Sequence, residues 1–254
     1  MIEFFDADVL IGRLIDQDLA EAPTMADVAA ELARTGAARA ALVTNTRIYL
    51  SNPAWGNDDL AADLDATRDE AGVELRGIFG LDTVEERPGT APDEQIERVM
   101  AHHAAGVQFW PAHCAYEFAS WQCPRLFDLL SQRRLPIFMH ADQASYAQLH
   151  EVMQRFDRLT IILQRVPYAA TRPIMGLMRA CPGLRLCTSP HFVGNQVIEQ
   201  FAHYLGHERL IFGSGLFTYD QLPAVAQVMY ARLDEDHKSA IAGGNLRRLL
   251  EAIQ

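Results

Sequence analysis

The stretch that decides the fold reads Pro136-Ile137-Phe138-Met139-His140, then a helical segment from Tyr146 to Phe156, then Thr160-Ile161-Ile162-Leu163-Gln164. Each apolar run is nearly continuous, as expected for a strand that is buried on both faces of a parallel sheet. In the segment between them, apolar residues recur every three or four positions, which indicates an amphipathic helix. The stretch therefore predicts a β-α-β unit with parallel strands.

The same alternation of short apolar runs and helical segments continues along most of the chain. The helical segment from Met25 to Arg34 has Thr24 as its expected N-cap. Eight runs read as strands: Ile2 to Asp8, Ala40 to Asn45, Glu74 to Gly80, Val107 to Trp110, Pro136 to His140, Thr160 to Gln164, Leu184 to Ser189 and Leu210 to Ser214. Eight repeats predict an α/β fold closed into a (β/α)8 TIM barrel, with residues 1–254 as one domain. An open doubly wound sheet is the alternative, but no Gly-x-Gly-x-x-Gly follows the first run.

Composition narrows the classes of partner. Of the 254 residues, 49% are hydrophobic and 22% are charged, which is typical of a globular domain. The net charge of −11 disfavours nucleic acid and anionic lipid as partners. No apolar stretch approaches the roughly 20 residues of a membrane span, and no export signal is evident. We therefore expect a cytoplasmic protein. Its four cysteines lack the spacing of a metal knuckle or redox pair, so we expect reduced thiols.

Polar side chains close most of the predicted strands. In a barrel of this kind the active site forms at the carboxyl ends of the strands. A buried polar group without a partner costs about 1–3 kcal/mol, so a cluster of them is best explained by a solvent-facing rim. The pattern predicts a pocket for a small molecule at the barrel mouth. We expect these residues to bind it: Asn45, Gln108, Trp110, His113, Gln164, Arg165, Ser189, His191 and Ser214.

Two residues are expected to carry acid-base chemistry there. A carboxylate beside an imidazole favours the charged imidazole, and such a pair can move a proton at neutral pH. If Asp8 and His140 lie within hydrogen-bond reach, Asp8 would orient His140. The alternative is structural, with His140 bonded to a loop and Asp8 capping backbone amides. Arg165 or Arg172 would hold a substrate carboxylate, although a solvated loop position explains either arginine equally well.

The last third of the chain and the first strand resemble a known family. Phe212-Gly213-Ser214-Gly215 followed by Gly243-Gly244-Asn245 is similar to the end of amidohydrolase-related barrels, which usually read Phe-Gly-Thr-Asp and then Gly-Asn. Phe5-Asp6-Ala7-Asp8-Val9-Leu10-Ile11-Gly12 is similar in frame to their usual start, Ile-Asp-x-His-x-His-x-Gly. The resemblance is to the amidohydrolase 2 group that includes aminocarboxymuconate-semialdehyde decarboxylase. The closing glycines predict a tight turn with positive φ, with Asn245 as a helix cap.

The resemblance also implies a metal centre, and this chain departs from it. The five metal-centre positions are occupied by Asp8, Leu10, His140, Gln164 and Gly215. Of these, only His140 matches the usual residue, and leucine and glycine side chains cannot ligate a metal. We therefore predict a divergent member with no metal cofactor.

An alternative keeps a metal with other ligands. Zinc would then be held by Asp8 and His140, with His113 or His191 completing the site. The expected function is that of a metal-independent hydrolase or lyase acting on a small carboxylated or ring compound. The alternative function is an inactive barrel that binds a small molecule or a protein partner, and a homodimer is compatible with the sequence.

Overall fold

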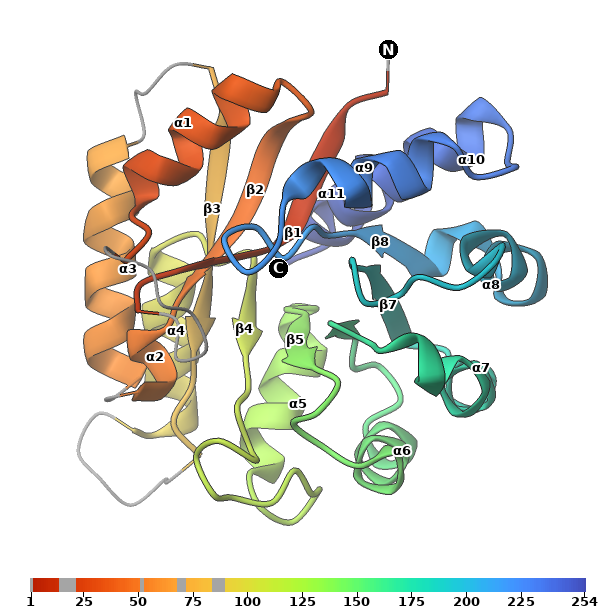
Figure 1. Cartoon of the computed structure of the whole chain (residues 1–254). Helices are drawn as coiled ribbons and strands as arrows, with labels where there is room; N and C mark the ends of the chain where they lie inside the picture. The colour runs from red at the N-terminus through yellow and green to blue at the C-terminus, as the bar shows by residue number, and fades with distance from the viewer. Residues whose placement is uncertain (1, 14–21, 51–52, 68–71, 84–89) are drawn as a thin grey trace.

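Eight parallel strands form the barrel, and helices surround it (Figure 1). The computed structural model describes residues 2–13, 22–50, 53–67, 72–83 and 90–254. The strands are β1 (Phe4–Ile11), β2 (Ala38–Asn45), β3 (Glu74–Gly80), β4 (Gly106–Gln108), β5 (Ile137–His140), β6 (Ile161–Gln164), β7 (Leu184–Thr188) and β8 (Leu210–Phe212). They pair in chain order from β1 to β8. The predicted α/β fold, a (β/α)8 TIM barrel, is confirmed.

The helices begin largely where the sequence places start signals. Those described are α1 (Met25–Thr35), α2 (Arg47–Leu50), α3 (Pro53–Thr67), α4 (Pro92–Ala101), α5 (Pro124–Arg133), α6 (Tyr146–Arg155), α7 (Thr171–Ala180), α8 (Val197–Leu205), α9 (Gln221–Met229), α10 (Glu235–Ser239) and α11 (Asn245–Glu251). Thr24 caps α1 as predicted, because its side chain accepts a hydrogen bond from the Asp27 amide. Ser145 caps α6 in the same way through Gln148.

The barrel is closed just beyond the end of β8. The Leu216 amide donates to the Asp8 carbonyl at 3.2 Å, and Leu216 also forms a parallel bridge with Val9. Closure therefore depends on residues that follow β8 rather than on β8 itself. This places the segment after β8 directly beside Asp8.

The first strand differs from its prediction. It was expected to end at Asp8, but β1 continues to Ile11 and is buried throughout. Asp6 pairs with Ala41 and Val9 with Val43, so two residues of β1 lie opposite the single residue Leu42. This is a β-bulge, which bends a strand and re-aims side chains. An extra residue cannot be read from apolar alternation, because the bulge is held by tertiary contacts.

The end of the chain seals the barrel. Leu246 and Leu250 of α11 pack with inward-facing residues such as Phe5 and Phe138, and we call this set the barrel plug. The predicted glycine turn is wrong: Gly244 has φ −60° and ψ −38°, and residues 240–244 form a π-helical turn that leads into α11.

Close packing explains the glycine at position 243, and side-chain hydrogen bonds explain the asparagine at position 245. A Cβ on Gly243 would lie 3.1 Å from the Glu3 carbonyl oxygen, so glycine allows a close approach of helix to strand. The Asn245 side chain donates to the carbonyls of His207 and Leu210, both at 2.8 Å. Asn245 therefore ties the closing helix to β8 instead of capping it.

The sequence also led us to expect no membrane-spanning segment and reduced cysteines. Within the described residues, no helix is long and apolar enough to cross a membrane. All four cysteines are free, and Cys123, Cys181 and Cys187 are buried. The three buried cysteines thus occupy the packing roles expected of reduced thiols, whereas Cys114 is exposed.

Candidate active site

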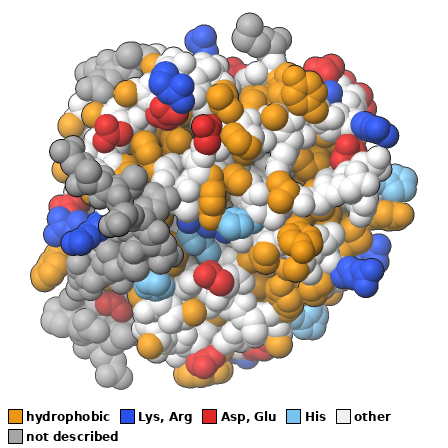
Figure 2. Space-filling view, in the orientation of Figure 1, with side chains coloured by type: hydrophobic (Ala, Val, Ile, Leu, Met, Phe, Trp, Pro, Cys, Tyr) orange, Lys and Arg blue, Asp and Glu red, His pale blue; other side chains and the backbone are white. Residues whose placement is uncertain are grey.

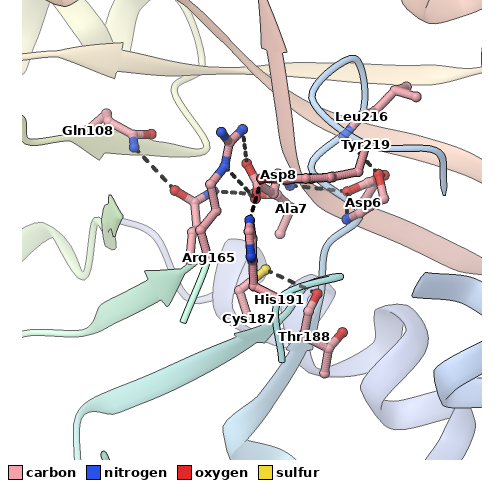
Figure 3. A network of polar contacts seen from close by, with 12 residues as sticks. Asp6, Ala7, Asp8, Gln108, Arg165, Cys187, Thr188, His191, Leu216 and Tyr219 are labelled. Carbon is pink, nitrogen blue, oxygen red and sulfur yellow. Dashed lines mark hydrogen bonds and ion pairs between the residues drawn. The ribbon is translucent and has the colours of Figure 1, made fainter. Parts of the chain in front are cut away.

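The centre of the barrel mouth is an ion pair between Asp8 and Arg165. Arg165 follows β6, and its Nε and Nη2 atoms each lie 3.3 Å from one Asp8 carboxylate oxygen (Figure 3). The Asp8 side chain is 3% exposed and that of Arg165 is 15% exposed. The bulge in β1 is what turns Asp8 toward this pair. The structure thus places two of the predicted site residues in contact.

The backbone at Arg165 supports a functional role. Its φ is +54°, in the left-handed region that few residues other than glycine adopt. Such strained positions cluster at ligand-binding and active sites, where surrounding contacts hold them. Here the strain aims the guanidinium into the mouth, next to strand β1.

A second aspartate, Asp6, closes the barrel seam. Its carboxylate accepts hydrogen bonds from the Ser214 amide at 2.9 Å and from the Gln221 side chain at 3.0 Å. It also accepts from the Ser214 hydroxyl and from the Asp8 amide, the latter at 3.1 Å. Burial raises the pKa of Asp6 to about 6, although the hydrogen bonds from Ser214 and Gln221 oppose that rise. The seam is structural, and it fixes the bulge that positions Asp8.

Ser214 therefore has a different role from the predicted one. Its hydroxyl donates to Asp6 and accepts from the Leu216 amide at 3.1 Å, and the side chain is fully buried. The hydroxyl is used within the barrel wall and is not presented to a ligand. Asn45 likewise makes a local contact, because its side-chain oxygen accepts from the Arg47 amide at 3.0 Å.

Gln164 spans the floor of the mouth. Its side-chain nitrogen donates to the Ala7 carbonyl at 2.7 Å, and its oxygen accepts from Gln108 at 3.2 Å. The three residues come from β6, β1 and β4, so the contacts cross the barrel. Both ends of the Gln164 amide are thereby occupied. Gln164 supports the site from below.

His140, Trp110 and His113 form an aromatic cluster beside the ion pair. The Trp110 ring packs edge-on against His140, with centroids 4.6 Å apart, and against His113 at 6.2 Å. Burial, and then the Arg165 charge, hold the pKa of His140 well below its usual range. His140 is therefore neutral at pH 7. Within the described part of the chain, no hydrogen bond joins its imidazole to the Asp8 carboxylate, which pairs with Arg165 instead. On one face, Figure 2 shows histidine and basic side chains together near the middle.

Tyr219 is the residue that sequence reasoning missed. It lies between β8 and α9, and its hydroxyl contacts Nε2 of His191, a predicted site residue. The two rings meet edge-on at 89°, with centroids 4.7 Å apart. Tyr219 stands outside the family pattern and beyond the predicted strand, so only the neighbouring His191 could have signalled it.

Several buried polar atoms at the mouth have no hydrogen-bond partner among the described residues. They are the hydroxyls of Thr44, Thr188 and Ser189 and the side-chain oxygen of Gln108. Each residue is no more than 5% exposed. Because burying an unsatisfied polar group costs about 1–3 kcal/mol, these atoms are best explained by a ligand or by water at the mouth.

A cavity of about 290 Å³ lies beside the aromatic cluster. It includes Gln108 and Trp110 from the predicted site, together with Tyr116, Leu81, Ile48 and Pro53. Drug-sized ligands occupy cavities of roughly 300–1,000 Å³, so this one suits a single small ring. Its walls combine apolar and aromatic side chains with polar ones such as Gln108 and Gln122, and the aromatic faces suit a flat ligand with polar substituents.

Fold and mouth together define a (β/α)8 barrel with a cluster of polar and charged side chains at the carboxyl ends of its strands. The family model described as amidohydrolase matches residues 16–252. The chain therefore belongs to the amidohydrolase family, as the resemblance predicted. This is a family of enzymes, which confirms the expectation of an enzyme.

Solved structures with the same fold cover nearly the whole chain. A 2,6-dihydroxybenzoate decarboxylase bound to 2,6-dihydroxybenzoate is 12% identical, with a TM-score of 0.79 and 99% of each chain covered. The 5-carboxyvanillate decarboxylase of Sphingomonas paucimobilis is 14% identical, with a TM-score of 0.72 and 100% of each chain covered. A dihydroxybenzoic acid decarboxylase of a Polaromonas species is 14% identical, with a TM-score of 0.74 and coverage of 99% of this chain and 97% of that one. No curated protein sequence matches the chain significantly. At these identities the structures show the shared fold.

The expectation that no cofactor is involved is wrong. The Polaromonas decarboxylase was solved with bound manganese and the inhibitor 2-nitroresorcinol, so a metal cofactor occurs among relatives of this fold. The sequence argument failed because it equated the loss of individual ligand positions with the loss of the cofactor. A site can instead be completed by other side chains, water or substrate.

The side chains described here do not by themselves fit such an ion. Across these residues, no group of three or more His, Cys, Asp or Glu side chains is placed to hold a metal. The zinc alternative required such a group around Asp8 and His140, but the Asp8 carboxylate faces the Arg165 guanidinium. We therefore derive no chemical step through a metal.

Proposed function

We propose that the protein is a lyase that removes the carboxylate from a small aromatic acid at the barrel mouth. The observation that carries this proposal is the Arg165 guanidinium, which a strained backbone and Asp8 aim into the mouth. A guanidinium recognises carboxylates through two parallel hydrogen bonds. The decarboxylases of the same fold, which act on dihydroxybenzoate and carboxyvanillate, support this substrate class.

The ion pair is suited to exchange with a substrate. Its two N–O distances of 3.3 Å exceed the roughly 2.7–2.9 Å of a strong charge-assisted hydrogen bond. A substrate carboxylate would bind Arg165 more closely, while Asp8 keeps the guanidinium oriented. Asp8 is thus proposed to act through Arg165, and not through His140 as the sequence suggested.

The aromatic cluster and cavity suit the ring of such a substrate. Trp110 and Tyr116 line the cavity and offer flat surfaces to a ring. The neutral His140 is proposed to accept a hydrogen bond or a proton from a ring hydroxyl. The unpartnered Ser189 hydroxyl and Gln108 oxygen are proposed to bind polar substituents. The cytoplasmic location and the homodimer stay predictions.

The test is product formation from a panel of acids. Purified protein would be incubated with 2,6-dihydroxybenzoate, 5-carboxyvanillate and benzoate, each with and without Mn²⁺, and the decarboxylated products quantified by chromatography. We expect at least one acid to be decarboxylated by the wild type but not detectably by Arg165→Met. Arg172→Met is the matched control, because Arg172 lies in an exposed position of the next helix.

Two results would contradict the proposal. Failure of the wild type to consume any acid under both metal conditions would exclude this reaction, and tight binding without turnover would favour the inactive binding barrel. Equal activity of Arg165→Met and Arg172→Met would remove Arg165 from substrate binding.

A further inference from the structure

We propose that Tyr219 is the group that protonates the substrate ring and that His191 supplies its proton. This inference rests on the proposed function and assigns a role that the family resemblance does not. It is carried by the placement of Tyr219 over Gly215, beside the Asp8–Arg165 ion pair.

The segment after β8 holds Tyr219 firmly. The Tyr219 amide donates to the Gly215 carbonyl at 2.9 Å, and Leu216 forms bridges with both Tyr219 and Val9. The same segment is tied to Asp8 through the Leu216 amide at 3.2 Å. Tyr219 is therefore fixed relative to the ion pair by backbone contacts alone.

The Tyr219 ring occupies space that a side chain at position 215 would need. Gly215 has a φ of +67°, and a Cβ built there would lie 2.8 Å from Cδ2 of Tyr219. That Cβ would also lie 3.7 Å from Oδ2 of Asp8, so this space adjoins the Asp8 carboxylate. Position 215 is where the resemblance expects an acidic side chain. The Tyr219 ring occupies the space that such a side chain would need, so a phenol lies at the mouth instead (Figure 3).

His191 connects this phenol to solvent. It lies in the segment after β7, is exposed, and contacts the Tyr219 hydroxyl through Nε2. Tyr219 is only partly exposed. An imidazole that reaches water on one side and a phenol on the other can relay a proton inward.

The step balances with the groups present and water. The bond between the ring carbon and the carboxylate breaks, CO₂ leaves, and the bonding electron pair stays on the ring carbon. That carbon takes the proton of the Tyr219 hydroxyl. His191 returns a proton to the phenolate and recovers it from water, so the net reaction is carboxylate plus proton to arene plus CO₂.

The experiment measures kcat and KM for decarboxylation of the best acid from the panel above, using the whole chain. The variants are Tyr219→Phe and His191→Ala. Tyr204→Phe is a matched control, because Tyr204 also meets a histidine edge-on, His203, with centroids 4.8 Å apart, but on the outer helix α8. Thermal unfolding checks that each variant folds.

General acid catalysis contributes about 10²–10⁴-fold, so we expect Tyr219→Phe to lose at least about 100-fold in kcat with KM within about threefold of wild type. His191→Ala should lose less, and added imidazole should restore part of its kcat but none of that of Tyr219→Phe. A purely structural role of His191 would not respond to imidazole.

The outcomes separate the two proposals. If the wild type decarboxylates no acid, the proposed function fails and this inference fails with it. If the wild type is active and Tyr219→Phe matches Tyr204→Phe, only the assignment of Tyr219 is overturned. If His191→Ala is inactive and imidazole restores nothing, His191 is not the proton source.

Discussion

Asp6 and Asp8 lie two residues apart on one strand, yet they belong to different parts of the molecule. Asp6 is buried in the barrel seam, and its two oxygens accept hydrogen bonds from Ser214, Gln221 and the Asp8 amide. Asp8 is buried at the mouth and faces the Arg165 guanidinium across two contacts of 3.3 Å. The Asp6 oxygens are occupied by hydrogen bonds from neutral groups, so Asp6 has a structural role in the barrel wall. The longer contacts of Asp8 leave the Arg165 guanidinium able to bind a second anion.

The bulge in β1 separates these two roles. Without the extra residue, Asp6 and Asp8 would point to the same side of a regular strand. The register shift between Asp6 and Val9 breaks that rule, and the Asp8 amide completes the bulge by donating to Asp6. The role of an acidic residue on this strand therefore follows from its partners and not from its place in the sequence.

The largest expected effect comes from removing the cation at the mouth. Arg165→Met leaves the Asp8 carboxylate buried without its partner, so we expect the free energy of unfolding to fall by about 3–5 kcal/mol. Adding Asp8→Asn should recover most of the loss, because no uncompensated charge remains. Urea unfolding at pH 7 measures both, with Arg172→Met as the control. A wild-type midpoint for Arg165→Met would show that the pair contributes nothing to folding.

The seam should show its own pH dependence. Folding raises the pKa of Asp6 from 3.8 to about 6, so the folded protein holds this proton more tightly than the unfolded chain. The stabilising contribution is complete below pH 3.8 and is lost as the pH rises to about 6. A shift of about two pKa units corresponds to roughly 3 kcal/mol. The difference in unfolding free energy between wild type and Asp6→Asn should change by most of this amount between pH 4 and pH 7. Parallel curves would refute it.

A smaller effect is expected at Gly215, which lies between the two regions. Its φ of +67° costs an alanine about 1–2 kcal/mol, and the added Cβ would also press on the Tyr219 ring. We expect Gly215→Ala to lower the unfolding free energy by about that amount and to lower kcat through displacement of Tyr219. Gly36→Ala is a suitable control, since its φ is +58° but nothing lies within 4 Å of its Cβ position. Equal effects of the two variants on kcat would contradict a role for the Tyr219 contact.

The smallest effect compares two buried serines. Ser214→Ala removes hydrogen bonds at the seam and should lower the unfolding free energy by about 1 kcal/mol without changing ligand affinity. The Ser189 hydroxyl has no partner in the part of the chain that the structure describes, so Ser189→Ala should leave stability unchanged or slightly higher and weaken binding of 2,6-dihydroxybenzoate. Titration calorimetry measures the binding of 2,6-dihydroxybenzoate to each variant, and urea unfolding measures the stability of each variant. The reverse pattern would show that Ser189, and not Ser214, belongs to the wall.

The sequence was sufficient for the barrel because its signals are local. Continuous apolar runs such as Ile161–Gln164 and the cap at Thr24 depend on neighbours in the chain, and both appear as predicted. The barrel mouth was also predictable, since parallel strands bring their carboxyl ends together. The length of β1 was not predicted correctly, because the strand continues beyond Asp8 through contacts with β2 and the segment after β8.

The partners within the mouth could not be read in the same way. The pairing of Asp8 with Arg165 joins residues far apart in the chain, and the left-handed backbone of Arg165 carries no sequence mark. The position of Tyr219 could not be predicted from the sequence, because its ring occupies space that is open only since residue 215 is a glycine. The prediction that no cofactor is involved rested on single ligand positions, and it conflicts with the manganese bound in a decarboxylase of the same fold.

The barrel plug has a consequence for how this protein can diverge. Leu246 and Leu250 fill the end of the barrel opposite the mouth, and Asn245 anchors them through two backbone carbonyls. This packing does not involve the side chains of the mouth. Substitutions around the Asp8–Arg165 ion pair that keep the pair itself could therefore change the substrate while the packing at the opposite end stays the same.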